Sequence, residues 1–310
     1  MRNLLVIPVV LVAALAWRNP VDMLIRGKWV RHFDTGKGEA TSTLCIPAES
    51  PAEIDGFRGD LPARVRAMHE AGATVVAIDL DLSAPHASDA ALRDAAATGK
   101  TLFARSAGAS AFAEPSGLRE MESTWFLPMV LGAVVASDTG VPLAAAALAA
   151  HLGTEATPQA GGSARIGDFL AYADGHLMPF MPYEVPFIHW TDTATWSTAK
   201  GRIVFVGACK ADRELTRFGR QPGAVAHGEL VETWRDARRP KQAHELVDVG
   251  VAMFVYAAGL LARIRAGLGG AAAVGAVAIL TSLGVALTGY WPGLSGLLVA
   301  TIMAIVVPKK

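Results

Sequence analysis

Between residues 42 and 235, short continuous apolar runs alternate with amphipathic stretches. The runs at residues 42–48, 74–82 and 201–209 predict strands that are buried on both faces. The stretches "DLPARVRAMHEAG", "SDAALRDAAATG" and "GELVETWRDAR" predict helices, because their apolar residues recur at helical spacing. Buried strands that alternate with helices are typical of a mostly parallel sheet with helices on both faces. The sequence therefore predicts an α/β fold here.

The C-terminal part has a different pattern. Residues 266–308 contain no charged side chain and no histidine. A helix needs about 20 residues to cross a bilayer, so this run fits two crossings. The sequence "GYWPG" at residues 289–293 divides it, because its proline and glycines favour a turn and its aromatic rings suit the lipid–water interface. A preceding apolar stretch, residues 246–262, predicts a third crossing.

A fourth apolar run opens the chain at residues 4–17, after Arg2. We interpret it as an uncleaved N-terminal anchor, but the small residues at 14–16 also fit a signal peptide. The expected organisation is an anchor at residues 1–17, an α/β domain at 18–245, and three membrane helices with a short tail at 246–310.

Basic residues predict the orientation of these spans. Arg2, the pair Arg263 and Arg265, and the pair Lys309 and Lys310 flank the apolar runs. Positively charged residues near membrane helices stay in the cytoplasm. With four crossings, residues 18–245 then lie on the periplasmic or extracellular side of a bacterial inner membrane.

Composition excludes some classes of function. The chain has 310 residues, of which 52% are apolar, and its 28 basic and 28 acidic residues balance. A basic surplus that would indicate nucleic-acid binding is absent. The sequence has no phosphate-binding glycine loop, and its two His-Glu pairs lack the second histidine of a zinc-protease helix. We expect no metal and no cofactor.

Candidate ligand-binding residues lie where predicted strands end. Asp79 and Asp81 come at the end of one strand, Gly207 and Cys209 at the end of another, and His227 precedes a helix. Open α/β sheets bind ligands at the carboxyl ends of their strands, so these residues would share a crevice. The alternative is that Asp79 caps local backbone and His227 is a turn residue. No base–nucleophile pair accompanies them, so we do not expect an enzyme.

The two cysteines, Cys45 and Cys209, each fall in a predicted strand. A disulfide is chemically permitted outside the cytoplasm. We favour the alternative of two buried thiols, because free cysteine packs as a small hydrophobic residue.

Three segments together resemble a known family. They are "GFRGDLPARVRAMHEAGATVVAIDLDLSAPHASDAALRDAA", "LGAVVASDTGVPLAAAALAAHL" and "AKGRIVFVGACKADRELTRFGRQPGAVAHGELVETW". Their order, followed by three apolar spans with a Trp-Pro turn, is similar to the second CHASE family, the cyclase/histidine-kinase-associated sensory extracellular domain of type two. The family's usual "Asp-x-Asp-Gly" followed by arginines is reduced here to "SDTGVPL".

The resemblance implies a bacterial receptor whose extracytoplasmic domain senses an unidentified signal. In this family a cytoplasmic output module usually follows the last span, whereas two lysines follow Pro308 here. The resemblance thus implies a sensor that acts on a separate effector, with Arg263, Arg265, Lys309 and Lys310 as candidate contacts. Receptors often work as dimers, so a homodimer is a possible arrangement that the sequence leaves open. The alternatives are a membrane-anchored scaffold without a ligand and an extracytoplasmic enzyme that uses Asp79, Asp81 and His227.

Overall fold

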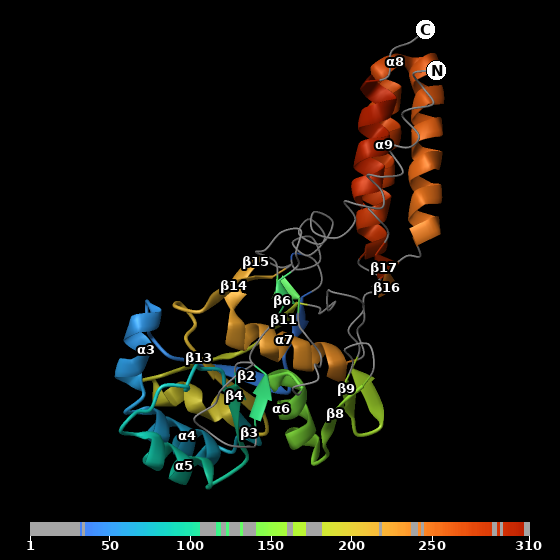
Figure 1. Cartoon of the computed structure of the whole chain (residues 1–310). Helices are drawn as coiled ribbons and strands as arrows, with labels where there is room; N and C mark the ends of the chain where they lie inside the picture. The colour runs from blue at the N-terminus through green and yellow to red at the C-terminus, as the bar shows by residue number, and fades with distance from the viewer. Residues whose placement is uncertain are drawn as a thin grey trace. The chain divides into compact units, whose positions relative to one another are not determined.

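The computed structural model of this chain divides into two compact units (Figure 1). One is the α/β unit, Thr35–Arg238, and the other is the helical unit, Met1–Asp34 with Arg239–Lys310. The structure describes residues 32, 35–105, 116–118, 122–123, 131–132, 141–159, 164–171, 182–216, 219–236, 241–242, 245–286, 290–291 and 294–306. The predicted anchor at residues 1–17 and the lysines Lys309 and Lys310 lie outside the described residues.

A six-stranded parallel sheet forms the centre of the α/β unit, in the order β12-β2-β13-β3-β4-β5. This confirms the prediction of an α/β fold with a parallel sheet. The strands are β2 (Thr41–Cys45), β3 (Val75–Ile78), β4 (Thr101–Arg105), β5 (Ser116–Leu118), β12 (Phe187–His189) and β13 (Ile203–Gly207).

Helices cover both faces of this sheet (Figure 1). Successive residues of a strand point to opposite faces, so Val204 and Val206 pack in one apolar cluster while Ile203 and Phe205 pack in the other. The first cluster includes α4 (Leu61–Glu70) and α5 (Asp89–Ala96), and the second includes α6 (Leu143–Leu152) and α7 (Gly223–Arg235).

The alanine-rich helix α6 packs in the apolar cluster on one face of the sheet. Its residues include Leu143, Ala147 and Leu148, which are buried against the sheet. A helix packed on a sheet buries its apolar face in the same way as a core helix of any α/β protein.

Smaller elements complete the α/β unit. Helix α3 (Pro51–Phe57) follows β2, and the 3-10 helix η3 (Thr193–Ala199) follows β12. The remaining strands pair outside the main sheet: β1 (Gly36–Lys37) with β11 (Tyr183–Glu184), β6 (Glu122–Ser123) with β7 (Leu131–Gly132), β8 (Ala156–Pro158) and β10 (Phe169–Ala171) with β9 (Ala164–Ile166), and β14 (Arg213–Thr216) with β15 (Gly219–Pro222).

A buried carboxylate ties the start of β2 to α7. Glu232 is 1% exposed, and its Oε1 accepts hydrogen bonds from the amides of Ala40 and Thr41 and from the Thr41 hydroxyl, each at 2.8 Å. Buried polar groups without partners destabilise a fold. The Glu232 carboxylate avoids this cost for three donors at once. Helix α7 is thereby fixed to the segment by which the chain enters the sheet.

The helical unit contains α8 (Glu245–Ala286), α9 (Leu294–Val306) and a short parallel pair of β16 (Lys241–Gln242) with β17 (Tyr290–Trp291). By length and composition, one described helix, Val249–Val285, could cross a membrane. The break between α8 and α9 contains the predicted turn "GYWPG". The four predicted crossings are thus reduced to one qualifying helix in the described part of the chain.

Gly267 interrupts α8 with a non-helical conformation, φ 73° and ψ −159°. Only glycine adopts this region readily, because a Cβ would clash with its own backbone. The sequence predicts a short connection between two helices at residues 262–267. The structure has a break at Gly267, the last residue of that stretch, and Arg263 and Arg265 lie in the helix before it.

Candidate functional site

The connections that follow β3 and β13 leave the sheet toward opposite faces. Strand β3 leads to α5 in one apolar cluster, whereas β13 leads to α7 in the other. The two strands are neighbours in the sheet. In open α/β sheets, such a change of direction leaves a crevice at the carboxyl ends of the strands, and ligands bind there.

A pocket of about 440 Å³ lies at this place, and we call it the switch-point pocket. Its walls come from α3, from the loop after β3 and from the loop after β13. The lining residues are Pro51, Ile54, Asp55 and Arg58 on the first wall, Leu80, Asp81, Ser83 and Ala84 on the second, and Ala208, Ala211 and Asp212 on the third. Apolar and polar side chains thus share a concave site, as in most small-molecule sites.

Asp81 is the one predicted ligand-binding residue that lines this pocket. Its Oδ1 accepts a hydrogen bond from the Ser83 amide at 3.0 Å, which fixes the turn after β3. Sequence reasoning missed Asp55 and Asp212. Their signal was weak, because each lies several residues beyond the end of a predicted strand and they approach Asp81 only through the folding of three separate segments.

Asp79 and His227 come together but are buried. Their side chains are each 2% exposed, and His227 Nε2 lies 3.9 Å from Asp79 Oδ1. The His227 ring stacks on Phe205, with 5.8 Å between ring centroids. These two residues therefore lie within the packing between β13 and α7, and they do not line the switch-point pocket.

Gly207 permits the close approach of α7 to β13. A Cβ at this position would lie 2.7 Å from the Ala224 Cβ, which is fixed to the helix backbone. Real Cβ atoms essentially never come so near one another. Gly207 is thus a packing residue. We predicted it as a ligand-binding residue, but what it provides is space for α7 against β13.

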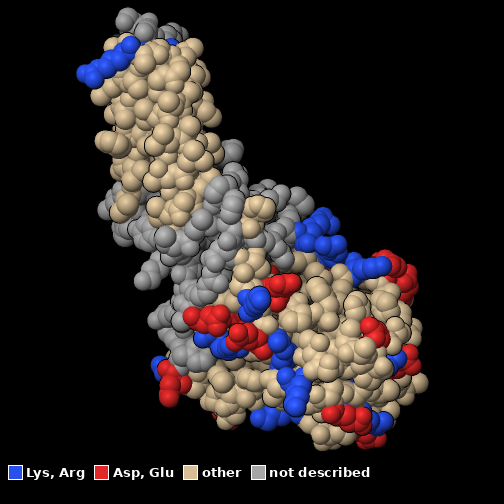
Figure 2. All heavy atoms as spheres, turned by 180° about the vertical axis from the view of Figure 1, so that it is seen from behind, with Lys and Arg blue, Asp and Glu red and all other residues tan. Residues whose placement is uncertain are grey.

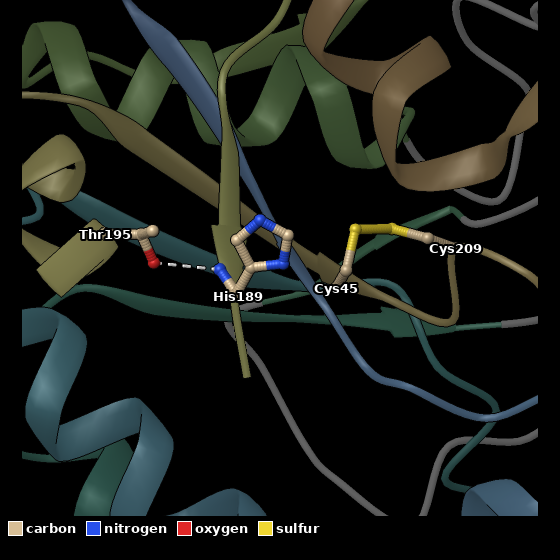
Figure 3. The surroundings of a disulfide bond; sticks show 4 residues. All are labelled: Cys45, His189, Thr195 and Cys209. Atoms are coloured by element: carbon tan, nitrogen blue, oxygen red, sulfur yellow. Dashed lines mark hydrogen bonds between the residues drawn. A yellow bond between two sulfur atoms is a disulfide. The ribbon is translucent and has the colours of Figure 1, made fainter. Parts of the chain in front are cut away.

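The cysteines correct our expectation of two buried thiols. Cys45 and Cys209 form a disulfide, with their Cα atoms 5.3 Å apart (Figure 3). Strand pairing brings them together, because Gly207 is the partner of Cys45 in the sheet and Cys209 follows two residues later. The loop that the bond closes is long, so the cross-link contributes about 2–4 kcal/mol to stability.

The disulfide lies at the same edge as the end of β12. His189 is the partner of Cys45 in the parallel pair, and its amide donates to Thr195 Oγ1 at 3.0 Å (Figure 3). Strand pairing and the disulfide thus hold the ends of β12, β2 and β13 side by side. The cross-link thus holds together the sheet edge from which the loop to Ala208 and Asp212 departs.

Arg58 is the buried charge of the pocket wall. Its side chain is 3% exposed and donates to the Ala84 carbonyl at 2.8 Å and to Asp89 Oδ1 at 2.9 Å. Asp89 also accepts from the His86 amide at 2.9 Å. The guanidinium therefore connects α3 to the loop after β3 and to the start of α5, and it determines the shape of two walls.

The candidate partner contacts lie in the helical unit. Arg263 donates from its guanidinium to the Ala304 carbonyl in the last turn of α9 at 3.1 Å. Cations near the carboxyl end of a helix are favourable, because the carbonyl groups there lack partners within the helix. Arg265 is exposed. Within the described residues, no group of three or more histidine, cysteine, aspartate or glutamate side chains could hold a metal ion.

No family model, curated protein or solved structure matches this chain. The likeness to the second CHASE family is therefore carried by the three sequence segments and their order.

Proposed function

We propose that this protein is a membrane-anchored extracytoplasmic sensor that binds a small ligand in the switch-point pocket and passes the signal to a separate effector. The observation that carries the proposal is the pocket itself. It lies at the change of chain direction in a parallel sheet, where this class of fold binds ligands. The resemblance to sensory domains of the second CHASE family agrees with it.

The Cys45–Cys209 disulfide supports an extracytoplasmic location for the α/β unit. Disulfides persist in oxidising compartments such as the bacterial periplasm and are rare in the reducing cytosol. The positive-inside rule applied to Arg263 and Arg265 gives the same orientation. Both arguments support the proposal that the pocket faces the outer side of a bacterial inner membrane.

The helical unit supports a membrane location. Large apolar side chains are exposed along both helices, including Phe254 at 72%, Ile264 at 67% and Val306 at 65%. On the face seen in Figure 2, the described part of this unit is uncharged along its length, and basic side chains lie at one end. A soluble protein would not leave such a surface in water, so lipid is its solvent. We propose a multi-pass arrangement, with α8 divided at Gly267.

Helix α7 is the element best placed to transmit a signal. Its first residue, Gly223, donates from its amide to the carbonyl of Asp212 in the pocket wall at 3.3 Å. Near its other end, Glu232 binds the amides of Ala40 and Thr41, which follow the N-terminal run. A ligand that shifts the Asp212 loop would therefore act, through one helix, on the segment at the start of β2.

Ligand binding is tested by thermal unfolding of the full chain in detergent against a library of amines, sugars, carboxylates and nucleotides. We expect at least one class to raise the melting temperature, because a ligand that binds only the folded state stabilises it by about 2.7 kcal/mol at a hundredfold excess over Kd. Ser83→Trp, which fills the exposed wall of the pocket, should abolish the shift, and Thr157→Trp on β8 should retain it. A shift that survives in Ser83→Trp, or no shift at all, contradicts the proposal and favours a scaffold.

Orientation is tested by labelling intact spheroplasts with a membrane-impermeant maleimide. We expect Cys45 and Cys209 to react from the outside, and only after reduction. Ala266→Cys, in a background with both native cysteines replaced by serine, is the control and should react only after permeabilisation. Native cysteines that react without reductant, or only in permeabilised cells, contradict the proposed location.

A further inference from the structure

The disulfide joins the two segments that lead into two walls of the switch-point pocket. Cys45 is the last residue of β2, and residues 46–50 then connect it to α3, which forms the first wall. Cys209 lies in the loop after β13, between the lining residues Ala208 and Ala211. The bond therefore limits how far these two walls can move apart.

The disulfide lies at an accessible part of the surface. Both cysteines are only partly buried, and His189, the partner of Cys45 in the neighbouring strand, is exposed. Paired residues of parallel strands point to the same face of a sheet, and Figure 3 shows the His189 ring next to Cys45. Reduction requires a thiolate to reach one of the two sulfur atoms. We therefore expect a dithiol in solution to reach this bond while the sheet stays folded.

The central strands have other contacts that hold them together. Strands β2 and β13 pair in parallel along five residues, from Thr41 to Cys45 in β2. One residue further, the Ile46 amide donates to the Gly207 carbonyl at 2.9 Å. Both strands also contribute side chains to the apolar clusters on the faces of the sheet. Reduction of the disulfide leaves these contacts in place, so its effect should be confined to the segments beyond the strand ends.

Beyond the strand ends, the disulfide is a stronger connection than the ion pair beside it. Lys210 pairs with Glu49, but their side chains are 65% and 62% exposed. Exposed ion pairs contribute little, because water screens them. From the same loop, the Asp212 carbonyl accepts a hydrogen bond from the Gly223 amide at 3.3 Å. A shift of this loop would therefore reach the start of α7.

We infer that the Cys45–Cys209 disulfide is a redox switch, operated by a dithiol reductant, that sets the shape of the switch-point pocket. Its role in signalling rests on the proposed function, because the shape of the pocket would decide ligand binding. One thiolate of the dithiol attacks one sulfur atom, which forms a mixed disulfide and releases the other cysteine as a thiolate. The second thiol of the reductant then breaks the mixed disulfide. Two electrons and two protons thus pass to Cys45 and Cys209, which become thiols, and the reductant becomes a disulfide.

The experiment is hydrogen exchange with mass spectrometry on the full chain in lipid nanodiscs, before and after reduction with dithiothreitol. The amides of residues 46–58 and 208–216 should exchange at least about tenfold faster after reduction, because local opening of both walls becomes easier. Helix α6, which packs on the other face of the sheet, should exchange at an unchanged rate. The double variant Cys45→Ser, Cys209→Ser is the matched control. It should show the fast exchange without reductant, and dithiothreitol should change it no further.

The rate of reduction tests whether the bond is accessible in the folded chain. Reduction by dithiothreitol, followed by maleimide labelling of the new thiols, should be faster than global unfolding of the same chain. A bond that is reduced only at the rate of global unfolding overturns the inference. Reduction that leaves the exchange of residues 46–58 and 208–216 unchanged also overturns it. Faster exchange in α6 as well would show that the disulfide holds the whole unit together, which contradicts a local switch.

These measurements need no ligand, so the switch and the proposed function can fail separately. If reduction loosens both walls but no ligand class raises the melting temperature, the switch stands and the sensor function fails. If a ligand class gives a shift that Ser83→Trp abolishes, but reduction leaves the walls unchanged, the sensor function stands and the switch is overturned.

Discussion

Replacing Glu232 with leucine is expected to lower the free energy of unfolding of the α/β unit by about 3–5 kcal/mol. The substitution leaves the amides of Ala40 and Thr41 and the Thr41 hydroxyl without their shared acceptor, Glu232 Oε1. Ala40 and Thr41 are 4% and 0% exposed, so water does not replace the lost acceptor. Each buried donor left without a partner costs about 1–3 kcal/mol.

Urea unfolding of the full chain, followed by tryptophan fluorescence, measures this change. Glu232→Gln keeps an oxygen acceptor at the same position and is expected to cost less than half as much. Glu39→Leu is the control for loss of a surface acid, because Glu39 pairs with Arg235 but its side chain is 71% exposed. Equal losses for Glu232→Leu and Glu232→Gln would show that the three hydrogen bonds do not determine the stability of this region.

The elements of the α/β unit follow from local patterns, but their order in the sheet does not. The runs that became β3 and β13 are fully buried, and their continuous apolar character predicted this. Strand β13 lies between β2 and β3, although more than a hundred residues separate it from either along the chain. A hydrophobic run indicates that a strand is buried, but it does not indicate which strand lies beside it. The crevice at the ends of β3 and β13 could therefore be expected only from the class of fold.

The same limit explains why most residues of the pocket could not be predicted from the sequence. Asp81 could be assigned because it directly follows a predicted strand. Asp55 lies on α3 and Arg58 directly follows it, and the position of this segment depends on tertiary contacts, including the pairing of Arg58 with Asp89. The disulfide depended on the register of β2 with β13, which sequence spacing does not reveal. Asp79 and His227 were expected to share a ligand crevice, whereas the packing of α7 leaves them close together and buried.

The helical unit was predicted best where chemistry forces a break. Helix α8 ends at Ala286 and α9 begins at Leu294, so the predicted turn "GYWPG" falls between two helices, as its composition indicated. The basic residues Arg263 and Arg265 indicated a break near residues 262–267, and the structure has it at Gly267. Both arginines lie in the helix before the break, and Arg263 donates to the Ala304 carbonyl of α9. A charged side chain can thus satisfy the end of a neighbouring helix and still lie within a helix.

Replacing Arg58 with methionine is expected to lower the free energy of unfolding by about 3–5 kcal/mol, because it leaves Asp89 as a buried charge without its partner. Asp89 is 8% exposed and would keep only the His86 amide among the contacts described above. The measurement is a double-mutant cycle by urea unfolding with Arg58→Met, Asp89→Leu and the double variant. The double variant should be more stable than Arg58→Met alone, since an apolar pair replaces the unpaired charge.

A coupling energy below about 0.5 kcal/mol between Arg58 and Asp89 would contradict the structural role of this pair, because its two members would then act independently on stability.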